Sequence, residues 1–327
     1  MRALVVEKLA DPDEALRWVD LPDPKFEPGK VKIRVQNAAV NFFDILLCQG
    51  KYQEKPPLPF TPGGEVAGIV TEVGPGSSLH VGQKVMATPL LPNGGFAQWV
   101  VVPEEAVYPI PEQMSFQEAA AMFITYQTSY YALHHRAHIQ PGEVLLVHAG
   151  AGGVGSSAIQ LGRAAGAKVI ATAGGPEKVE ICRDLGADIA IDYRREDFVD
   201  VVKRETNGKG ADVIYDPVGG DVFDKSRKCI AFDGRLLVIG FAGGRIADAP
   251  TNHALVKNYS IVGVHWGLFR RKVPGGSRQI HAKLMELYRD GHIRPLIYQE
   301  FQLEDVPRAL HLLSSRNTWG KLVVAIP

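Results

Sequence analysis

The sequence has few cysteines, no surplus of either charge and no apolar run long enough to span a membrane. Its three cysteines lie far apart among 327 residues and form no C-x-x-C pair, which argues against a disulfide scaffold, a zinc ribbon and a dithiol redox site. Lys and Arg together number 36, as do Asp and Glu, so no overall field attracts nucleic acid or an anionic membrane. The opening residues, MRALVVEK, are typical of a strand rather than of a signal peptide. We therefore expect a cytoplasmic protein with a small-molecule ligand, and neither nucleic acid nor a membrane as its main partner.

The length predicts two domains, and the pattern of the sequence changes along the chain. Residues 1–123 hold short β-type runs broken by Pro and Gly, which indicate a compact, mostly β domain. Residues 124–265 alternate between strand and helix patterns, with six candidate strands at 144–147, 168–172, 189–191, 212–215, 236–239 and 260–264. This alternation predicts a doubly wound parallel α/β domain of the Rossmann type. We expect the last segment, 266–327, to return to the β domain and the active site to lie in the cleft between the two lobes.

A glycine motif follows the first of these strands. Gly150, Gly152 and Gly155 satisfy G-x-G-x-x-G, and the apolar spacing after them predicts a helix over 156–165. The chemistry requires glycine because a side chain would hold the backbone away from a pyrophosphate, whose charge is met by N–H groups at the start of the helix. A glycine-rich turn without a ligand is the alternative, but the strand before and the helix after favour a dinucleotide site.

The residues after the second strand bear on which nucleotide is bound. A site for NAD normally has an Asp or Glu there, to accept hydrogen bonds from the ribose 2′-hydroxyl, but this chain has Gly174 and Gly175. Without that acid a 2′-phosphate is not repelled, and Lys178, Tyr193 and Arg194 can offer it two charges and a hydroxyl. NADP(H) is therefore the favoured cofactor. A solvated Lys178 and a Tyr193 that only anchors its loop remain open alternatives.

Several motifs in order resemble one protein family. They are GGEVAGIV at 63–70, HAGAGGVG at 148–155, DYRREDF at 192–198 and DPVGG at 216–220. Together they resemble the medium-chain dehydrogenase/reductase superfamily, and most of all its zinc-free NADPH:quinone oxidoreductase branch, which includes zeta-crystallin. The resemblance spans the whole chain. It implies a GroES-like, mostly β catalytic domain in two segments, 1–123 and 266–327, around a Rossmann NADP(H)-binding domain at 124–265, and a homodimer or homotetramer.

The glycine motif, the ends of the strands and the resemblance together indicate which residues hold the cofactor. Some match the positions of the pyrophosphate loop, others those of the 2′-phosphate site or of the nicotinamide end. The expected contacts are Asn41, Thr128, Gly150, Gly152, Gly153, Val154, Gly155, Gly174, Lys178, Tyr193, Phe241 and Arg316.

The sequence argues against a metal. Zinc-dependent members of the superfamily have Cys where this chain has Asn41 and His where it has Gly64. Catalytic zinc needs about three ligands of the Cys, His or carboxylate type. His134, His135 and His138 form the only histidine cluster; on a helix, the first and last would share a face, but no carboxylate completes a site, and we favour a plain surface role. We therefore expect no metal.

Without a Lewis acid, oxidation of simple alcohols is disfavoured, whereas hydride transfer to an electrophilic acceptor remains feasible. The developing oxyanion then needs hydrogen-bond donors, and the candidate catalytic residues are Tyr52 and Asn41. An equal alternative is that Tyr52 only packs against the turn at 55–60 and takes no part in catalysis. The expected walls of the substrate pocket are Phe43, Tyr52, Phe96 and Trp266, each of which could instead belong to the core.

We expect a zinc-independent oxidoreductase that transfers hydride from NADPH to a quinone. A second possibility is NADPH-dependent reduction of an activated C=C bond in an alkenal, enone or enoyl thioester. A third, weaker one is a nucleotide-binding protein without catalytic activity.

Overall fold

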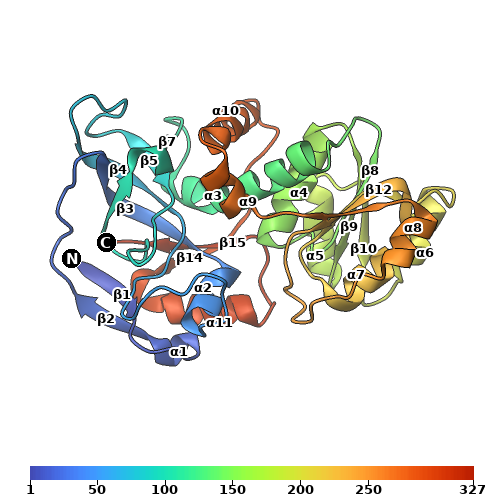
Figure 1. Ribbon diagram of the computed structural model, residues 1–327, viewed down its shortest axis with the longest axis horizontal. Coiled ribbons are helices and arrows are strands. Elements are labelled where there is room, and N and C mark those ends of the chain that lie inside the picture. Colours follow the sequence, from blue (N-terminus) through green and yellow to red (C-terminus); the bar gives the residue numbers. More distant parts are fainter. The chain divides into compact units, whose positions relative to one another are not determined.

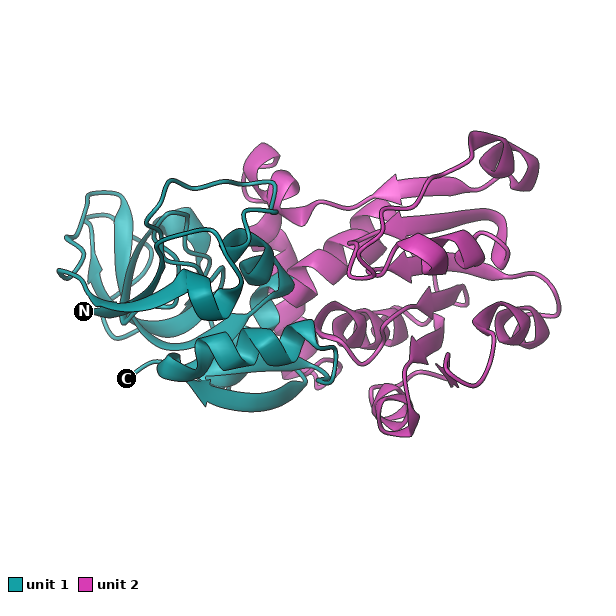
Figure 2. Cartoon of the chain, turned by 90° about the horizontal axis from the view of Figure 1, so that it is seen from below, with its two compact units in different colours: residues 1–124, 295–327 teal, residues 125–294 magenta.

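The computed structural model describes residues 1–327 and divides into two compact units (Figure 2). The first unit comprises residues 1–124 and 295–327, and the second comprises residues 125–294. The mostly β unit is therefore made of two separated segments, as expected. The second boundary differs from the expected one, because residues 266–294 cluster with the nucleotide-binding unit rather than with the tail.

Hydrogen bonds within the second unit explain this difference. Helix α3 (Phe116–Tyr130) carries Gln127, whose Nε2 donates to the carbonyl of Ser277 at 3.0 Å. The hydroxyl of Tyr126 and Nε2 of Gln160 both donate to the carbonyl of Arg294, at 2.9 and 3.0 Å. These contacts join residues more than a hundred positions apart, so the end of the strand–helix alternation near residue 265 does not mark the end of the unit.

The second unit is built on a six-stranded parallel sheet (Figure 1). Its strands are β8 (Val144–Val147), β9 (Lys168–Ala173), β10 (Ile189–Asp192), β11 (Ala211–Asp216), β12 (Ile230–Val238) and β13 (Ser260–Gly263). The order across the sheet is β10-β9-β8-β11-β12-β13, so the winding reverses between β8 and β11. A ligand site is expected beyond the carboxyl ends of the strands at such a reversal. All six predicted strands are present, although the fifth begins at Ile230 rather than at residue 236.

Helices connect these strands. They are α4 (Gly153–Ala164), α5 (Pro176–Asp184), α6 (Phe198–Glu205), α7 (Gly220–Ser226), α8 (Thr251–Lys257), α9 (Trp266–Lys272) and α10 (Gly276–Arg289), with a π-helical segment, η2 (Tyr131–Arg136), after α3. The apolar pattern and the capping residues explain the extent of α6. The Asp197 carboxylate accepts a hydrogen bond from the N–H of Val199, and Asn207 and Gly208, both with left-handed φ angles, follow the end of the helix. No helix of the chain is both long enough and apolar enough to cross a membrane.

The first unit holds a two-stranded antiparallel sheet and a larger, mostly antiparallel one. β1 (Arg2–Val6) and β2 (Leu16–Asp20) form one. The other has the order β14-β15-β3-β4-β5-β7, with β6 beside β3. Its strands are β3 (Lys30–Val40), β4 (Val66–Val73), β5 (Lys84–Ala87), β6 (Trp99–Pro103), β7 (Val107–Pro109), β14 (Ile297–Gln302) and β15 (Lys321–Ala325). The remaining elements are α1 (Pro12–Ala15), α2 (Phe42–Cys48), η1 (Glu104–Ala106), η3 (Leu303–Asp305) and α11 (Val306–Ser314). All pairs in this second sheet are antiparallel except β14 with β15.

The last strand confirms that the tail returns to the first domain. β15 pairs with the central strand β3, with Leu322 opposite Val40 and Val324 opposite Ala38. All four of these residues are buried in the unit's core. The three cysteines of the chain, Cys48, Cys182 and Cys229, are likewise buried, and none is in a disulfide.

Candidate active site

The glycine motif joins β8 to α4 at the carboxyl edge of the parallel sheet. Helix α4 begins at Gly153, inside the motif, rather than at residue 156 as predicted. Gly152 is the N-cap and no side chain caps the helix. The N–H groups of Gly153, Val154 and Gly155 therefore have no acceptor within the helix. These donors at the N-terminus of α4 favour the binding of an anion.

The three glycines of the motif are required for different structural reasons. A Cβ on Gly155 would lie 2.1 Å from the carbonyl oxygen of Ala149, so any side chain there would push α4 off the loop. A Cβ on Gly150 would lie 2.8 Å from Sγ of Cys182, so this glycine allows the loop to pack on α5. A Cβ on Gly152 would meet only the Ala149 oxygen, at 3.2 Å. The first and third glycines serve packing, while the second leaves the loop open to a pyrophosphate.

His148, just before the loop, is a structural residue. Its imidazole is buried between Thr172 and Ser226, with Nδ1 3.0 Å from Oγ1 of the threonine and Nε2 2.8 Å from Oγ of the serine. Burial lowers the pKa of His148 to about 3. The ring therefore stays neutral and links β9 to α7 beneath the glycine loop.

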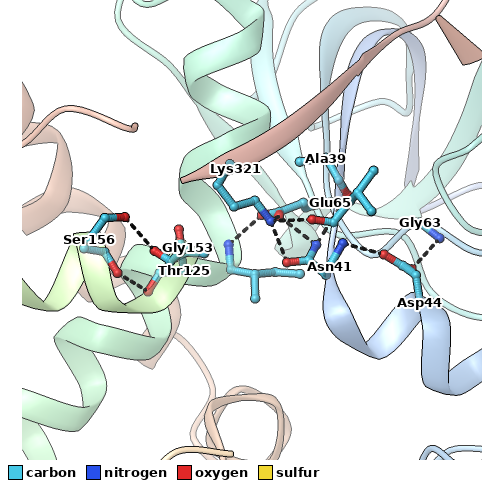
Figure 3. Close-up of polar contacts among 12 residues, drawn as sticks. Ala39, Asn41, Asp44, Gly63, Glu65, Thr125, Gly153, Ser156 and Lys321 are labelled. Carbon is cyan, nitrogen blue, oxygen red and sulfur yellow. Dashed lines mark hydrogen bonds and ion pairs between the residues drawn. The ribbon is translucent and has the colours of Figure 1, made fainter. Parts of the chain in front are cut away.

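Buried hydroxyl groups hold α4 against α3. The Ser129 hydroxyl lies 2.8 Å from both the Ser157 and the Tyr215 hydroxyl, and it donates to the carbonyl of Val154. The Ser156 hydroxyl donates to the carbonyl of Gly153 at 2.9 Å (Figure 3). Thr128, the expected contact of the nicotinamide end, is half-buried beside Ser129 and so sits on a fixed part of α3.

The expected 2′-phosphate residues gather at the ends of β9 and β10. The hydroxyl of Tyr193 lies over Gly174, 2.5 Å from where a Cβ would stand, and the guanidinium of Arg194 lies beside the same glycine. Burial lowers the pKa of Lys178, and the nearby charge of Arg194 lowers it further. Two cations and a hydroxyl thus share one small region, which a phosphate dianion would stabilise.

Sequence reasoning missed the residue that organises this region. Asp192 ends β10, and its Oδ1 accepts from the N–H groups of Gly175 and Arg194, at 3.0 and 3.1 Å. The Gly175 N–H, above all, holds the pKa of this carboxyl below its usual range. Asp192 lies on the third strand, and its acceptor oxygen is already engaged by backbone donors. The position of Asp192 directly before Tyr193 is the feature of the sequence that could have indicated this role.

Phe241, the remaining expected cofactor contact of this unit, lies in the loop after β12 and is exposed. Its ring packs over Gly219, where a Cβ would stand 3.1 Å from Cδ1. Gly219 and Val218 donate their N–H groups to Oδ1 of the buried Asp216, so the DPVGG loop is fixed at the carboxyl end of β11.

In the first unit, the side chain of Asn41 contacts both members of a buried ion pair (Figure 3). Nζ of Lys321 lies 2.9 Å from Oε1 of Glu65, and it donates to Oδ1 of Asn41 at 2.6 Å and to the carbonyl of Val40 at 2.9 Å. The second oxygen of Glu65 accepts the N–H of Ile124 at 2.7 Å. All three ammonium hydrogens and both carboxylate oxygens have partners, so burial leaves neither charge unsatisfied.

The same contacts bear on the role expected of Asn41. Its Nδ2 donates to Glu65 at 2.8 Å and to the carbonyl of Ala39 at 3.3 Å. Both amide hydrogens are engaged inside the unit, which argues against Asn41 as a donor to an acceptor molecule. The N–H of Asn41 and that of Gly63 donate to Asp44, whose pKa burial raises to about 7. Asp44 thus fixes the start of α2.

Phe43 and Tyr52 form an aromatic pair in the first unit. Their ring centroids are 5.5 Å apart, and both rings are half-buried. The Phe43 ring covers Gly64, where an added Cβ would stand 2.3 Å from Cζ. An aromatic ring therefore occupies the space that a side chain at position 64 would need.

The other expected residues lie elsewhere. Phe96 is fully buried in the core of the first unit, and Trp266 is buried at the start of α9, which argues against either as a pocket wall. The Arg270 guanidinium lies 5.4 Å from the Trp266 ring, and α9 carries both residues. Arg316 is exposed in the tail of the first unit, and its contact with a 2′-phosphate stays a prediction.

The histidine cluster has a different geometry from the expected one. His134 and His135 lie in the π-helical segment η2, and His138 follows it with a left-handed φ of 49°. The helical spacing that would place His134 and His138 on one face is therefore absent. His134 instead packs on the Tyr130 ring, with centroids 4.2 Å apart. No group of three or more His, Cys, Asp or Glu side chains in the chain is arranged to hold a metal.

Comparison with known proteins agrees with this geometry. The alcohol dehydrogenase GroES-like domain matches residues 27–112, and the zinc-binding dehydrogenase family matches residues 153–282, a segment that includes neither Asn41 nor Gly64. A quinone oxidoreductase-like protein 2 homolog of Nematostella vectensis is 43% identical over 90% of this chain and 81% of its own length. Escherichia coli quinone oxidoreductase, solved with NADPH, superposes with a TM-score of 0.92 at 29% identity, over 99% of this chain and 100% of that one. The CurK enoyl reductase superposes with a TM-score of 0.90 at 29% identity, over 100% of this chain and 99% of that one.

The chain therefore belongs to the medium-chain dehydrogenase/reductase superfamily, in its quinone oxidoreductase-like branch, and is an oxidoreductase of that family. This confirms the resemblance drawn from the motifs and the fold class predicted from the strand–helix alternation.

The ion pair leads to a stability prediction. Lys321→Met leaves Glu65 buried without its cation, and we expect the free energy of unfolding to fall by about 3–5 kcal/mol. Urea unfolding measures this, with Lys25→Met as the matched control, since Lys25 is exposed and should change stability by less than about 0.5 kcal/mol. Adding Glu65→Gln to Lys321→Met should recover part of the loss. Equal stability of the Lys321→Met and Lys25→Met variants would contradict the assignment.

Proposed function

We propose that this protein is an NADPH-dependent reductase that transfers hydride to a quinone without a metal. The observation that carries the proposal is the aromatic pair of Phe43 and Tyr52 over Gly64. Where zinc-dependent members place a metal ligand, this chain presents an apolar surface of two aromatic rings tilted by 34° to one another. Such a surface suits a planar, already electrophilic ring, which needs no Lewis acid.

The second unit has the features that a dinucleotide requires. The uncapped start of α4 would receive the pyrophosphate, and Gly152 leaves room for it. When bound, NADPH supplies a hydride from its nicotinamide ring. Thr128, held by the buried hydroxyls around Ser129, would contact the nicotinamide end.

Preference for NADPH over NADH rests on Lys178, Tyr193 and Arg194. Burial, and after it the charge of Arg194, disfavours the positive charge of Lys178, and a bound anion would offset both effects. Asp192 fixes the backbone that carries Tyr193 and Arg194, so the donors are preorganised.

The acceptor would lie on the aromatic pair. Its oxygen gains negative charge as hydride arrives, and the Tyr52 hydroxyl is the candidate donor to that oxygen. Asn41 serves instead as a structural residue, because its amide is held by Lys321 and Glu65.

Reduction of an activated C=C bond is the second candidate, and the likeness to an enoyl reductase over the whole chain favours keeping it. That reaction also develops an oxyanion and needs no metal. The two functions differ in the shape of the acceptor, which is a flat ring in one case and an open chain in the other.

An acceptor panel tests the function. With NADPH, we expect reduction of 1,2-naphthoquinone to exceed that of crotonyl-CoA and of an alkenal, because the aromatic pair favours a flat ring. Tyr52→Phe should lower kcat for the quinone by about 10- to 100-fold, while KM changes little. A preference for the thioester would establish the second candidate, and tight NADPH binding without turnover of any acceptor would leave only a nucleotide-binding protein.

The 2′-phosphate site predicts a specific loss. Lys178→Glu should raise the Kd for NADPH by about 30-fold and that for NADH by less than about threefold, since a charged hydrogen bond contributes about 1.5–3 kcal/mol. Fluorescence titration of both cofactors measures the two constants. Lys203→Glu on the exposed face of α6 makes the same change of charge and is the matched control. Equal losses for NADPH and NADH in the Lys178→Glu variant would refute the assignment.

We also propose a homodimer formed at β13, in a protein of the cytoplasm. β13 is an edge strand, and Ile261 on it is exposed. The exposed fractions of Leu255 and Val256 on α8 are 80% and 83%, and Phe232 on β12 is also exposed. Pairing of β13 with its symmetry mate would satisfy the open edge and cover apolar surface.

Light scattering tests the assembly. We expect the mass of a dimer for the native protein and of a monomer for the double variant Ile261→Glu, Leu255→Glu, because the like charges would face each other across the interface. Val81→Glu, which places a charge on an exposed valine of the first unit, should leave the dimer intact. A native protein of monomer mass would rule the interface out.

A further inference from the structure

A cavity of about 280 Å³ lies in the first unit, under the loop that carries Tyr52. Apolar side chains and one glycine form most of its lining: Leu9, Leu47, Gly50, Leu58 and Phe60. Pockets that hold a whole drug-sized ligand measure about 300–1,000 Å³, so this one suits part of a molecule.

The backbone fixes this cavity at both ends of the loop. At the start, the N–H groups of Lys51 and Tyr52 donate to the carbonyl of Leu46, at 2.8 and 3.3 Å. At the end, Phe60 exchanges hydrogen bonds with Val6, at 2.7 and 3.2 Å. The two ends of the loop that lines the cavity are therefore fixed by backbone hydrogen bonds.

The lining is mostly apolar, among its buried and its exposed residues alike. Leu47 and Phe60 are buried, whereas 55% of Leu9 and 44% of Leu58 remain exposed. Two exposed leucines beside an apolar cavity favour a ligand that removes both from water. Glu54 and Lys55 also line the cavity, so it presents one charge of each sign and no net charge to the ligand. An uncharged aliphatic chain fits this chemistry.

The cavity and the aromatic pair are formed in part by the same loop, and neither Phe43 nor Tyr52 itself lines the cavity. Gly50 and Glu54 line it, and Tyr52 lies between them with its ring packed on Phe43. A ring held on the aromatic pair would thus have an apolar space for a substituent within two residues of Tyr52.

We propose that this cavity binds the aliphatic tail of the acceptor, so that the preferred substrates are quinones with an alkyl or prenyl side chain. This inference rests on the proposed quinone reductase function. Each methylene group that the cavity removes from water should raise kcat/KM by up to about fourfold. The gain should stop once the cavity is full, because further carbons stay in water.

The test is the tail-length dependence of kcat/KM at saturating NADPH, for benzoquinones with unbranched tails of zero to about ten carbons. In the native protein we expect a rise with tail length and then a plateau. Leu58→Trp fills the cavity from its exposed side, and it should lower kcat/KM for the long-tailed quinones by about tenfold while that for the untailed quinone changes less than twofold. Leu9→Trp fills the cavity from the other exposed leucine and should do the same. Leu90→Trp, at an exposed leucine outside the cavity, is the matched control and should change neither value.

The outcomes separate this inference from the function on which it rests. A flat tail-length dependence in the native protein, or the same dependence in both filled variants, overturns the cavity assignment while quinone reduction stands. Absence of activity on any quinone overturns the proposed function. In that case, we compare the binding of a fluorescent probe with a decyl chain to the native protein and to the two filled variants. This comparison decides whether the cavity binds an aliphatic chain. Equal binding by all three proteins would reject it.

Discussion

The buried ion pair between Lys321 and Glu65 organises the first unit. Glu65 precedes β4, its cation opens β15, and its second oxygen holds Ile124 on α3. Three parts of the sequence that are far apart thus meet at one pair of charges. Because burying charges costs several kcal/mol per ion, the pair persists only with every hydrogen bond made. This requirement explains why Asn41 and the carbonyl of Val40 are drawn into the same network.

This network changes how Asn41 and its neighbours are understood. Asn41 stands where the family resemblance places a zinc ligand, yet its side chain faces an ammonium and a carboxylate within the unit. Gly64 stands where the second ligand would be, and it is covered by Phe43. Replacing these two residues by Cys and His would therefore meet a positive charge at one position and an aromatic ring at the other. At these two positions, the packing of this chain as well as its residue types disfavours zinc ligands.

Features that depend on neighbouring residues could be predicted from the sequence. The glycine loop, the six parallel strands and the place of Lys178 and Tyr193 follow from short patterns, and the family resemblance supplied their roles. Features that depend on distant partners could not. Lys321 contacts Asn41 from 280 residues away, and nothing near Lys321 in the sequence indicates that contact. For the same reason the second unit extends to Arg294, and Phe96 lies in a core rather than at a surface.

The burial of the three cysteines has a chemical consequence for the acceptor. Quinones and enones are electrophiles that add to thiolates, so an exposed, ionised cysteine would be alkylated by the very molecules that we propose as substrates. Burial raises the pKa of Cys48, Cys182 and Cys229 to about 12 in each case. At neutral pH these sulfurs are protonated as well as shielded. The chain therefore exposes no thiolate to the electrophile that we propose as its substrate.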